Sequence, residues 1–488
     1  MTDRKNAHFH RVEWEGLQSP WELEDLAGSP VLPAGSERVE LRRDEQYRID
    51  AKILGTRDFS SANLLPDLGE MGEIVPDYRI EGSSHRGGFR YELDHCVVNR
   101  VSTKGEELEA ELKTYRARRT ATRGRGPRAW LAEWYLNAHD KSLLYPRFVE
   151  REFKETYRRD REYPEENVVF EGQWSRNSGH YAFVEAPDLA FAVELVPEGL
   201  RPSWCRGLAI EYRDEWGGVP EEATRGSIAN AVSFVMGRPL IGVGHTAFDA
   251  SGFPIDEVAL SPVQRDLVSV CRSAEHPPVR LDERKPTDRF QTLMTELVPR
   301  YLELNGEFDF DNVLWGYWLF EETPLGANLP VLATSVEMLK RAWYSSKRSK
   351  SRGVYMPKKD FDRLLEEELA AMEKKLREVE YGGRMMSRLR SAYNLGSNES
   401  MEFFLGELGL PIGPTERSAI KARNPMAHGS AALLDESRHQ ETVNDTLSYR
   451  TLFNRILLKI LGYDGAYVDY SAREWPERSL DEPLGGRR

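Results

Sequence analysis

Polar and apolar residues alternate in short runs over the first 260 residues of the chain. In residues 38–54, for example, apolar side chains such as Val39 and Leu41 fall on odd positions, which is the two-residue period of a strand with one buried face. Similar runs occupy residues 89–101, 108–115, 167–173, 180–184 and 191–196. Gly, Pro, Asn and Asp separate the runs, so the pattern predicts antiparallel sheet, arranged as a sandwich or a barrel.

Two stretches in this half depart from the alternation. Residues 129–159 are rich in helix formers and predict a helical insertion, or a connection between two β lobes with a break near 129–165. Residues 220–237 begin with Pro and two Glu and end with Gly, which predicts a helix. Residues 237–255 then resemble two strands around an Asp249-Ala250-Ser251-Gly252 turn.

From Asp288 to Leu461 the apolar residues recur at helical spacing instead. Gly462 follows the last stripe and predicts the end of its helix. Four or five such helices predict an up-and-down bundle. The stripes are Leu293, Leu297, Tyr301 and Leu304; Leu332, Val336, Leu339 and Trp343; Phe361, Leu365, Leu369, Met372, Leu376 and Val379; and Leu452, Ile456, Leu457 and Ile460.

The change of period predicts an α+β protein, with an antiparallel β-rich amino-terminal region followed by an all-α bundle. We place the β-rich sensing or regulatory region at residues 1–275 and a proline-containing linker at 276–287. The helical domain then covers residues 288–475, and residues 476–488 are expected to be a flexible tail.

Composition narrows the class of protein further. Hydrophobic residues make up 40% and charged residues 30% of the chain, a balance typical of folded domains. No apolar run is long enough to span a membrane and no secretory signal is recognisable, so we expect a cytoplasmic protein with no membrane partner. The three cysteines lack metal-ligand spacing, so we expect free thiols and neither metal nor cofactor.

The net charge of the chain is −13. This charge argues against a protein that coats long nucleic acid through bulk electrostatic attraction. A local basic groove in an acidic body stays compatible with that charge. Two basic stretches stand out, in residues 113–128 and at Lys347, Arg348, Lys350 and Arg352. Either stretch could be a solvated loop or a contact with nucleic acid, and we take Lys347 and Arg348 as candidate RNA-binding residues.

The segment that points to chemistry is Lys421-Ala422-Arg423-Asn424-Pro425-Met426-Ala427-His428-Gly429. Asn before Pro predicts a helix start, with Asn424 as N-cap and Pro425 at the first helical position. Arg423 and His428 would then lie beside a helix N-terminus, which favours a phosphate group. An imidazole exchanges protons near neutral pH, and a guanidinium can bind phosphate oxygens, so the pair suits cleavage of an RNA phosphodiester.

Spacing alone does not identify this pair, because Arg90/His95 and Arg238/His245 also fit the loose pattern Arg-x(4–6)-His. The surrounding sequence does more: the helical carboxy-terminal region resembles HEPN domains, especially those of ApeA-like bacterial defence proteins. The matching features are Arg-Asn-x-x-x-His at the expected opening of a late helix, and an apolar terminal helix that ends in Leu461-Gly462-Tyr463-Asp464-Gly465-Ala466-Tyr467. The upstream segment LPVLATSVEMLKRAWY resembles the helix that faces the motif in these families and carries Glu337.

The resemblance implies a metal-independent endoribonuclease in which the 2′-OH of the RNA attacks its own phosphate. It also implies a homodimer that brings two motifs together, and an antiviral, abortive-infection role with RNA, including tRNA, as substrate. Arg423, His428, Asn424 and Glu337 would be catalytic. We also take Lys421 and Ser430 as candidate RNA-binding residues, because they lie close to this motif in the sequence. The β-rich region would bind a phage-derived trigger or restrain the nuclease.

Other interpretations of the same residues stay open. Arg423 and His428 could be an ordinary helix-capping pair, and Asn424 a simple N-cap. Glu337 could pair with Arg341 one turn later on its helix surface, or it could fix Arg423 from behind. The helical bundle could be a non-catalytic dimerisation or nucleotide-binding module with a β-rich ligand-binding domain. A carbohydrate-binding β domain with a helical oligomerisation tail is a third interpretation.

Overall fold

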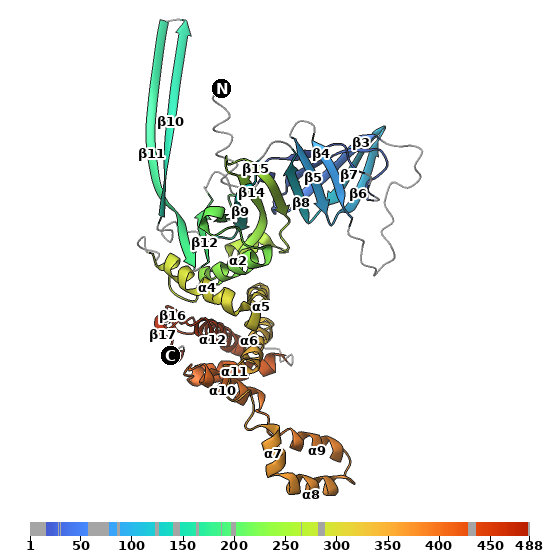
Figure 1. Ribbon diagram of the computed structural model, residues 1–488, viewed down its shortest axis with the longest axis vertical. Helices are drawn as coiled ribbons and strands as arrows, with labels where there is room; N and C mark the ends of the chain where they lie inside the picture. Colours follow the sequence, from blue (N-terminus) through green and yellow to red (C-terminus); the bar gives the residue numbers. More distant parts are fainter. Residues whose placement is uncertain are drawn as a thin grey trace. The chain divides into compact units, whose positions relative to one another are not determined.

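The computed structural model describes residues 16–27, 29, 31–56, 78–84, 88–122, 126–139, 147–162, 165–186, 188–196, 202–264, 266–281, 288–427 and 436–486. The chain forms two compact units (Figure 1). The first comprises Met1–Glu275 and Leu281–Thr295, and the second His276–Arg280 and Glu296–Arg488. Strands dominate the first unit and helices the second, which confirms the α+β class with a β-rich first part.

One sheet of the first unit has five antiparallel strands in the order β1-β2-β3-β7-β6. Its strand β7 shows how the sequence period produces the fold: Leu108, Ala110 and Leu112 are buried, and the residues between them are exposed. The bounds are β1 (Trp21–Leu23), β2 (Ser36–Arg43), β3 (Ile49–Thr56), β6 (Val97–Lys104) and β7 (Glu107–Lys113), with a 3-10 turn η1 (Gly16–Gln18) before them.

The second sheet has ten strands in the order β10-β11-β12-β13-β9-β14-β15-β8-β5-β4, and each neighbouring pair is antiparallel. Strand β11 pairs with β12 only over residues 181–186, so the rest of β10 and β11 forms a two-stranded ribbon (Figure 1). The bounds are β4 (Ile80–Ser84), β5 (Phe89–Asp94), β8 (Arg116–Ala121), β9 (Arg128–Leu136), β10 (Arg147–Glu162), β11 (Glu165–Ala186), β12 (Leu189–Leu195), β13 (Gly207–Arg213), β14 (Ile241–Asp249) and β15 (Pro254–Leu260).

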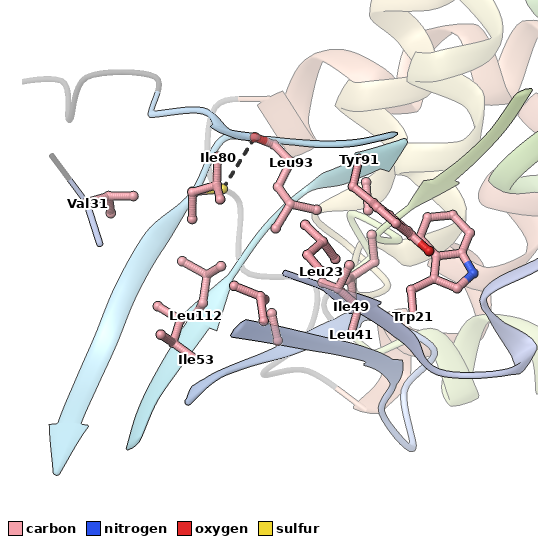
Figure 2. Packing of buried hydrophobic residues seen from close by; sticks show 14 of the residues in the cluster. Trp21, Leu23, Val31, Leu41, Ile49, Ile53, Ile80, Tyr91, Leu93 and Leu112 are labelled. Carbon is pink, nitrogen blue, oxygen red and sulfur yellow. Dashed lines mark hydrogen bonds between the residues drawn. The ribbon is translucent and has the colours of Figure 1, made fainter. Parts of the chain in front are cut away.

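The two sheets share a core. Side chains of β2, β3 and β7 pack with those of β4, β5, β8 and β15, and Figure 2 shows residues such as Leu41, Tyr91 and Leu93 pointing into one apolar cluster. The Arg43 guanidinium at the end of β2 donates to the backbone oxygens of Val243 (2.7 Å) and Leu260 (2.6 Å). These charge-assisted bonds fix the five-stranded sheet to strands β14 and β15.

Several local predictions for this unit are confirmed. Helix α2 (Glu222–Met236) ends at Gly237, which adopts the left-handed conformation (φ 71°) that favours glycine at a helix end. Strands β14 and β15 flank the expected turn, where Asp249 Oδ1 accepts from the Ser251 and Phe253 amides. The unit also contains η4 (Asp214–Trp216) and the short helix α3 (Leu267–Arg272).

The helical insertion predicted for residues 129–159 is wrong. Residues 128–136 form β9, which lies between β13 and β14 in the middle of the ten-stranded sheet, and residues 147–162 form β10. Strand β9 is buried on both faces, so its sequence lacks the alternation that marks a half-buried strand. Cross-strand ion pairs also explain part of the first basic stretch, since Arg118 binds Asp256 (2.7 Å) and Arg119 binds Glu257.

The second unit is organised around helix α6, which packs against α5, α10, α11 and α12 and buries Leu332, Val336 and Leu339. Helix α12 buries Leu452, Phe453, Ile456 and Leu457, and Gly462 ends it as predicted, with φ 80°. The helices are α4 (Arg289–Phe308), α5 (Phe310–Glu322), α6 (Asn328–Ser345), α7 (Lys358–Leu364), α8 (Glu366–Leu376), α9 (Gly382–Arg390), α10 (Ser397–Glu407), α11 (Pro414–Ala427) and α12 (Glu436–Ile460).

The third apolar stripe is not the core stripe that its spacing predicts. It divides between α7 and α8, Leu365 leaves the helical conformation between them, and α8 has no buried residue. Met372 and Val379 are exposed, whereas Phe361 is buried. Spacing detects an apolar helix face, but it cannot show whether another element covers that face.

Described residues in both expected boundary segments make contacts within the second unit. Residues 277 and 278 of the expected linker accept hydrogen bonds from Tyr470 Oη (2.7 Å) and the Val468 amide (2.9 Å). In the expected tail, β17 (Glu477–Ser479) pairs with β16 (Ala466–Val468), and Leu480 and Leu484 are buried. The tail is therefore part of the second unit, because its apolar side chains complete the core there.

Two expectations from composition can be compared with the structure. Cys96 and Cys205 are buried free thiols, and Cys271 is a half-buried free thiol. Within the described ranges, no helix combines the length and the apolar character needed to cross a membrane.

Candidate functional site

Arg423 lies inside helix α11, close to its carboxy-terminal end. The predicted helix start at Asn424–Pro425 is therefore wrong, because the helix begins at Pro414 and continues to Ala427. Pro414 occupies the first helical position, and the Gly413 amide donates to Glu416 Oε2 (2.9 Å), as in a capping box. Pro425 removes only one backbone hydrogen bond in the last turn, where the helix is about to end.

This placement also changes the electrostatics expected at the motif. The carboxy-terminal end of a helix carries partial negative charge, which stabilises a cation such as Arg423 and does not attract phosphate. Any anion at this site would have to be bound by side chains. His428 follows the helix directly in the sequence but lies outside the described residues, as does Ser430.

Three helices meet at the Arg423 guanidinium. Its Nη1 donates to Glu337 Oε1 on α6 (2.5 Å), and its Nη2 donates to Ser397 Oγ at the start of α10 (2.6 Å). The Ser397 backbone oxygen accepts a longer bond from Nη2 (3.4 Å). Charge-assisted bonds from two directions hold the guanidinium in one orientation, which is the preorganisation that a catalytic cation needs.

The other oxygen of Glu337 binds a second cation, because Lys340 Nζ lies 2.7 Å from Oε2. The carboxylate thus bridges Arg423 and Lys340, and the cluster of three side chains carries one excess positive charge. Tyr449 of α12 lies beside the same guanidinium. Burial raises the pKa of Tyr449 to about 12, and the charge of Arg423 partly offsets that effect, so the phenol stays neutral at physiological pH.

The cluster is buried on one side and open on the other. The Arg423 side chain is only 5% exposed, whereas the Glu337 side chain is 37% exposed and Ser397 is also exposed. A guanidinium has five N–H donors, and the three bonds described above use at most three of them. The arrangement can therefore hold Arg423 in place and still offer donors to an anion that approaches from the exposed side.

Among the other predicted site residues in the described ranges, Glu337 is the one whose side chain binds Arg423. Glu337 contacts Arg423, as one of the two predictions required, and its ion-pair partners among the described residues are Arg423 and Lys340 rather than Arg341. Lys421 is exposed on α11, two residues before Arg423. Lys347 is exposed, and Arg348 pairs with Glu307 (3.4 Å). The backbone of Asn424 belongs to α11, so its predicted N-cap role is wrong.

The sequence did not single out three residues that lie around the Arg423–Glu337 pair: Ser397, Lys340 and Tyr449. Ser397 follows Gly396 at a helix start, and Tyr449 precedes the last apolar stripe by one turn, so each had an ordinary structural explanation. Lys340 lies three residues after Glu337, a spacing that places both on one helix face. That spacing was the one signal in the sequence that could have identified a member of the cluster.

The two other Arg/His spacings occur in structural settings. Arg90 of β5 pairs with Glu81 of β4 (2.6 Å). His95, the histidine at the matching spacing, follows the end of β5. Arg238 is buried and binds Glu275 (2.8 Å), while burial lowers the pKa of His245 to about 4. A histidine with that pKa is neutral near pH 7 and is poorly suited to proton transfer there.

Among the residues that the structure describes, no group of three or more His, Cys, Asp or Glu side chains is arranged to hold a metal ion. Comparisons with protein-family models, with curated proteins and with solved structures found no match to this chain. The geometry around Arg423 and the sequence that follows it are therefore the features that bear on function.

Proposed function

We propose that the helical unit is a metal-independent endoribonuclease of the HEPN type, in which Arg423 and His428 act together. The observation that carries the proposal is the Arg423 guanidinium, held by Glu337 of α6 and Ser397 of α10 five residues before His428. A cation held near the end of a helix, with a histidine five residues later in the sequence, provides the two groups that phosphodiester cleavage needs. The sequence resemblance to HEPN domains supports the same assignment.

In the proposed reaction, the His428 imidazole accepts the proton of the RNA 2′-OH. The 2′-oxygen then forms a bond to the adjacent phosphorus, and the bond from phosphorus to the 5′-oxygen breaks. The leaving 5′-oxygen takes up a proton from solvent, and the His428 imidazolium returns its proton to solvent, so the products are a 2′,3′-cyclic phosphate and a 5′-OH. Arg423 binds the non-bridging oxygens as negative charge builds on them, and Glu337 is a positioning residue for Arg423.

The wider biological role follows from the same resemblance. We place the enzyme in antiviral defence by abortive infection, acting as a homodimer on RNA such as tRNA. The β-rich unit would bind a phage-derived trigger and restrain the nuclease until the trigger arrives. A nuclease that is toxic to its own cell requires such control.

The test compares two histidine variants of the full-length protein on total tRNA. His428→Ala should reduce cleavage by about 10²- to 10⁴-fold, the usual contribution of a general acid or base. His439→Ala, a change of an exposed histidine on α12, is the matched control and should cleave like the wild type. Equal cleavage by the wild type and His428→Ala would contradict the proposal.

A non-catalytic role is the second candidate, and one observation favours it. Both terminal nitrogens of Arg423 already bind protein groups, and the side chain is almost fully buried, as expected for an arginine that joins helices. The bundle would then be a dimerisation or nucleotide-binding module. In that case the wild-type protein would bind RNA or nucleotides without producing cyclic-phosphate ends.

A further inference from the structure

The segment that contains α7, α8 and α9 has very little core of its own. Its buried positions on these helices are Phe361, Gly382 and Met386. The tight connection from α8 to α9 depends on Gly382, because a Cβ at this position would collide with the Leu376 backbone oxygen. Most of the surface of this three-helix segment, which we call the hairpin, therefore faces solvent and is available to a ligand.

A groove of about 600 Å³ lies in this hairpin. Its volume is within the range of sites that bind small molecules or short polymer segments. The lining comes from the first residue of α7, from the end of α8, and from α9 and the residues after it. The lining includes the polar side chains of Lys358, Glu373, Arg377, Arg390, Ser391 and Tyr393.

The charges that line the groove do not cancel. Glu373 is the acidic residue in the lining, and it is paired with Arg390 at 2.7 Å. Lys358 and Arg377 form no ion pair within the described part of the chain, and both are exposed. The groove thus keeps two uncompensated positive charges beside the hydroxyl of Ser391, which is a setting that favours phosphate oxygens.

The surrounding segment has the same sign of charge. Between Lys347 and Tyr393 the chain has thirteen Lys or Arg against eight Asp or Glu, although the whole protein carries a net charge of −13. A basic island on an acidic body attracts a polyanion locally while the rest of the surface repels it. This contrast favours a short stretch of nucleic acid over a long one.

Aromatic side chains lie beside these charges. Tyr393 lines the groove, and Tyr381, at the turn into α9, is 63% exposed. The Arg384 guanidinium lies 5.6 Å from the centre of the Tyr381 ring. Proteins that bind single-stranded nucleic acid combine a basic groove for the backbone with aromatic platforms for the bases, and stacking contributes about 1–3 kcal/mol per base.

We propose that the groove of α7, α8 and α9 binds the backbone of single-stranded RNA, with Lys358 and Arg377 contacting phosphates and the tyrosines offering surfaces for bases. The choice of RNA as the polymer rests on the proposed function. The groove would be a substrate-binding surface separate from the residues around Arg423.

The experiment measures the affinity of the full-length His428→Ala protein for a short fluorescein-labelled oligouridine. Because this background does not cut RNA under the proposed function, binding is read without cleavage. The test variant adds Lys358→Glu and Arg377→Glu. The matched control adds Lys374→Glu and Lys375→Glu, which make the same change of charge on exposed residues of α8 that do not line the groove.

The groove variant should bind at least about tenfold more weakly than its parent, and the control less than about threefold. The slope of log K against log salt should become shallower by about 1.4 in the groove variant, since each lost contact with a single strand contributes about 0.7. Equal weakening in both variants, or no weakening in either, would overturn the proposal. Displacement of the oligouridine by uridine monophosphate at equal phosphate concentration would also overturn it, in favour of a mononucleotide site.

The outcomes separate this inference from the nuclease proposal. Binding of oligouridine that depends on Lys358 and Arg377, in a protein whose wild type does not cleave RNA, would support the groove and contradict the nuclease. RNA cleavage by the wild type, together with oligouridine binding that does not depend on Lys358 and Arg377, would support the nuclease and contradict the groove. Circular dichroism of each variant checks that the hairpin is still folded, which we expect because the changed residues are exposed.

Discussion

Two arginine–glutamate pairs in the helical unit have the same chemistry and differ in their surroundings. Arg455 of α12 binds Glu416 of α11 at 2.7 Å, and both side chains are 0% exposed. Arg423 of α11 binds Glu337 of α6 at 2.5 Å, but the Glu337 side chain is 37% exposed. We call the first the closed pair and the second the open pair.

The protein supplies most of the hydrogen-bond partners of the closed pair, and Arg455 Nε is a buried donor that is left without one in the described part of the chain. Arg455 also donates to the Pro411 and Leu480 backbone oxygens (3.1 Å each), and Glu416 accepts from the Gly413 and Leu484 amides. These contacts join the start of α11, helix α12 and the carboxy-terminal segment. No solvent-facing edge is left for a ligand, so the closed pair serves folding.

The open pair differs because one side of it is exposed to solvent. Glu337 shares its carboxylate with Lys340, and Ser397 is exposed beside it, so one edge of the cluster faces solvent. The helix that carries Arg423 ends four residues later, and His428 follows. Burial of the arginine is therefore similar in the two pairs and does not decide its role. The exposure of the glutamate partner distinguishes a pair that a ligand can reach from one that it cannot.

The largest expected effect is on stability, from Arg455→Met in the closed pair. Loss of one partner leaves Glu416 as an unpaired buried carboxylate, which costs about 3–5 kcal/mol of unfolding free energy. Urea denaturation followed by circular dichroism measures it. Arg417→Met, which removes an exposed ion pair with Glu402, is the control and should change stability by less than about 1 kcal/mol. A similarly small change for Arg455→Met would remove the distinction between the pairs.

The next effect is on activity, from Arg423→Met in the open pair. We expect a loss of about 10²-fold or more in RNA cleavage, because the developing charge on phosphate loses its fixed cation. The loss of stability should be smaller than for Arg455→Met, about 1–2 kcal/mol, since Glu337 keeps Lys340 and solvent as partners. Cleavage rates and urea midpoints on the same samples would measure both. Full activity with a stability loss equal to that of Arg455→Met would make both pairs structural.

The smallest effect concerns Asp445 of α12, which lies between Arg423 and Arg455 in the sequence. Burial, and then the like charge of Glu441, raises the pKa of Asp445 to about 6. The folded state therefore holds this proton at a pH where the unfolded chain, with a pKa of about 3.9, has released it. Stability should fall as pH rises from about 4 to about 6 and stay lower above that.

Asp445→Asn tests this linkage. Allowing for solvent screening of a half-buried group, the variant should be about 1 kcal/mol more stable than the wild type near pH 7 and similar to it near pH 4. Thermal unfolding at the two pH values gives the comparison. An equal difference at both values would mean that the charge of Asp445 is not responsible.

Much of the fold follows from the periodicity of the sequence. The alternation in residues 108–115 predicted β7, and the glycine stops at Gly237 and Gly462 predicted the ends of α2 and α12. Strand β9 escaped prediction because a strand buried on both faces has no alternation. The long stripe from Phe361 to Val379 misled because apolar spacing does not reveal whether a partner covers the helix.

The site was predictable only in part. Glu337 and Arg423 were singled out together, and the structure brings them into contact. The Asn424–Pro425 start signal failed because the stronger signal was upstream, where Pro414 and Glu416 begin the helix. Ser397 could not be predicted, since its bond to Arg423 joins residues 26 positions apart and depends on how α10 packs against α11.

The most direct test of the proposed nuclease is the chemistry of the RNA ends that the full-length wild-type protein produces in the presence of EDTA. The account predicts cleavage of tRNA to fragments that end in 2′,3′-cyclic phosphate, with 5′-OH on the following fragment, because the 2′-oxygen is the nucleophile. Fragments with 5′-phosphate ends, or cleavage that appears only after a divalent metal is added, would contradict it.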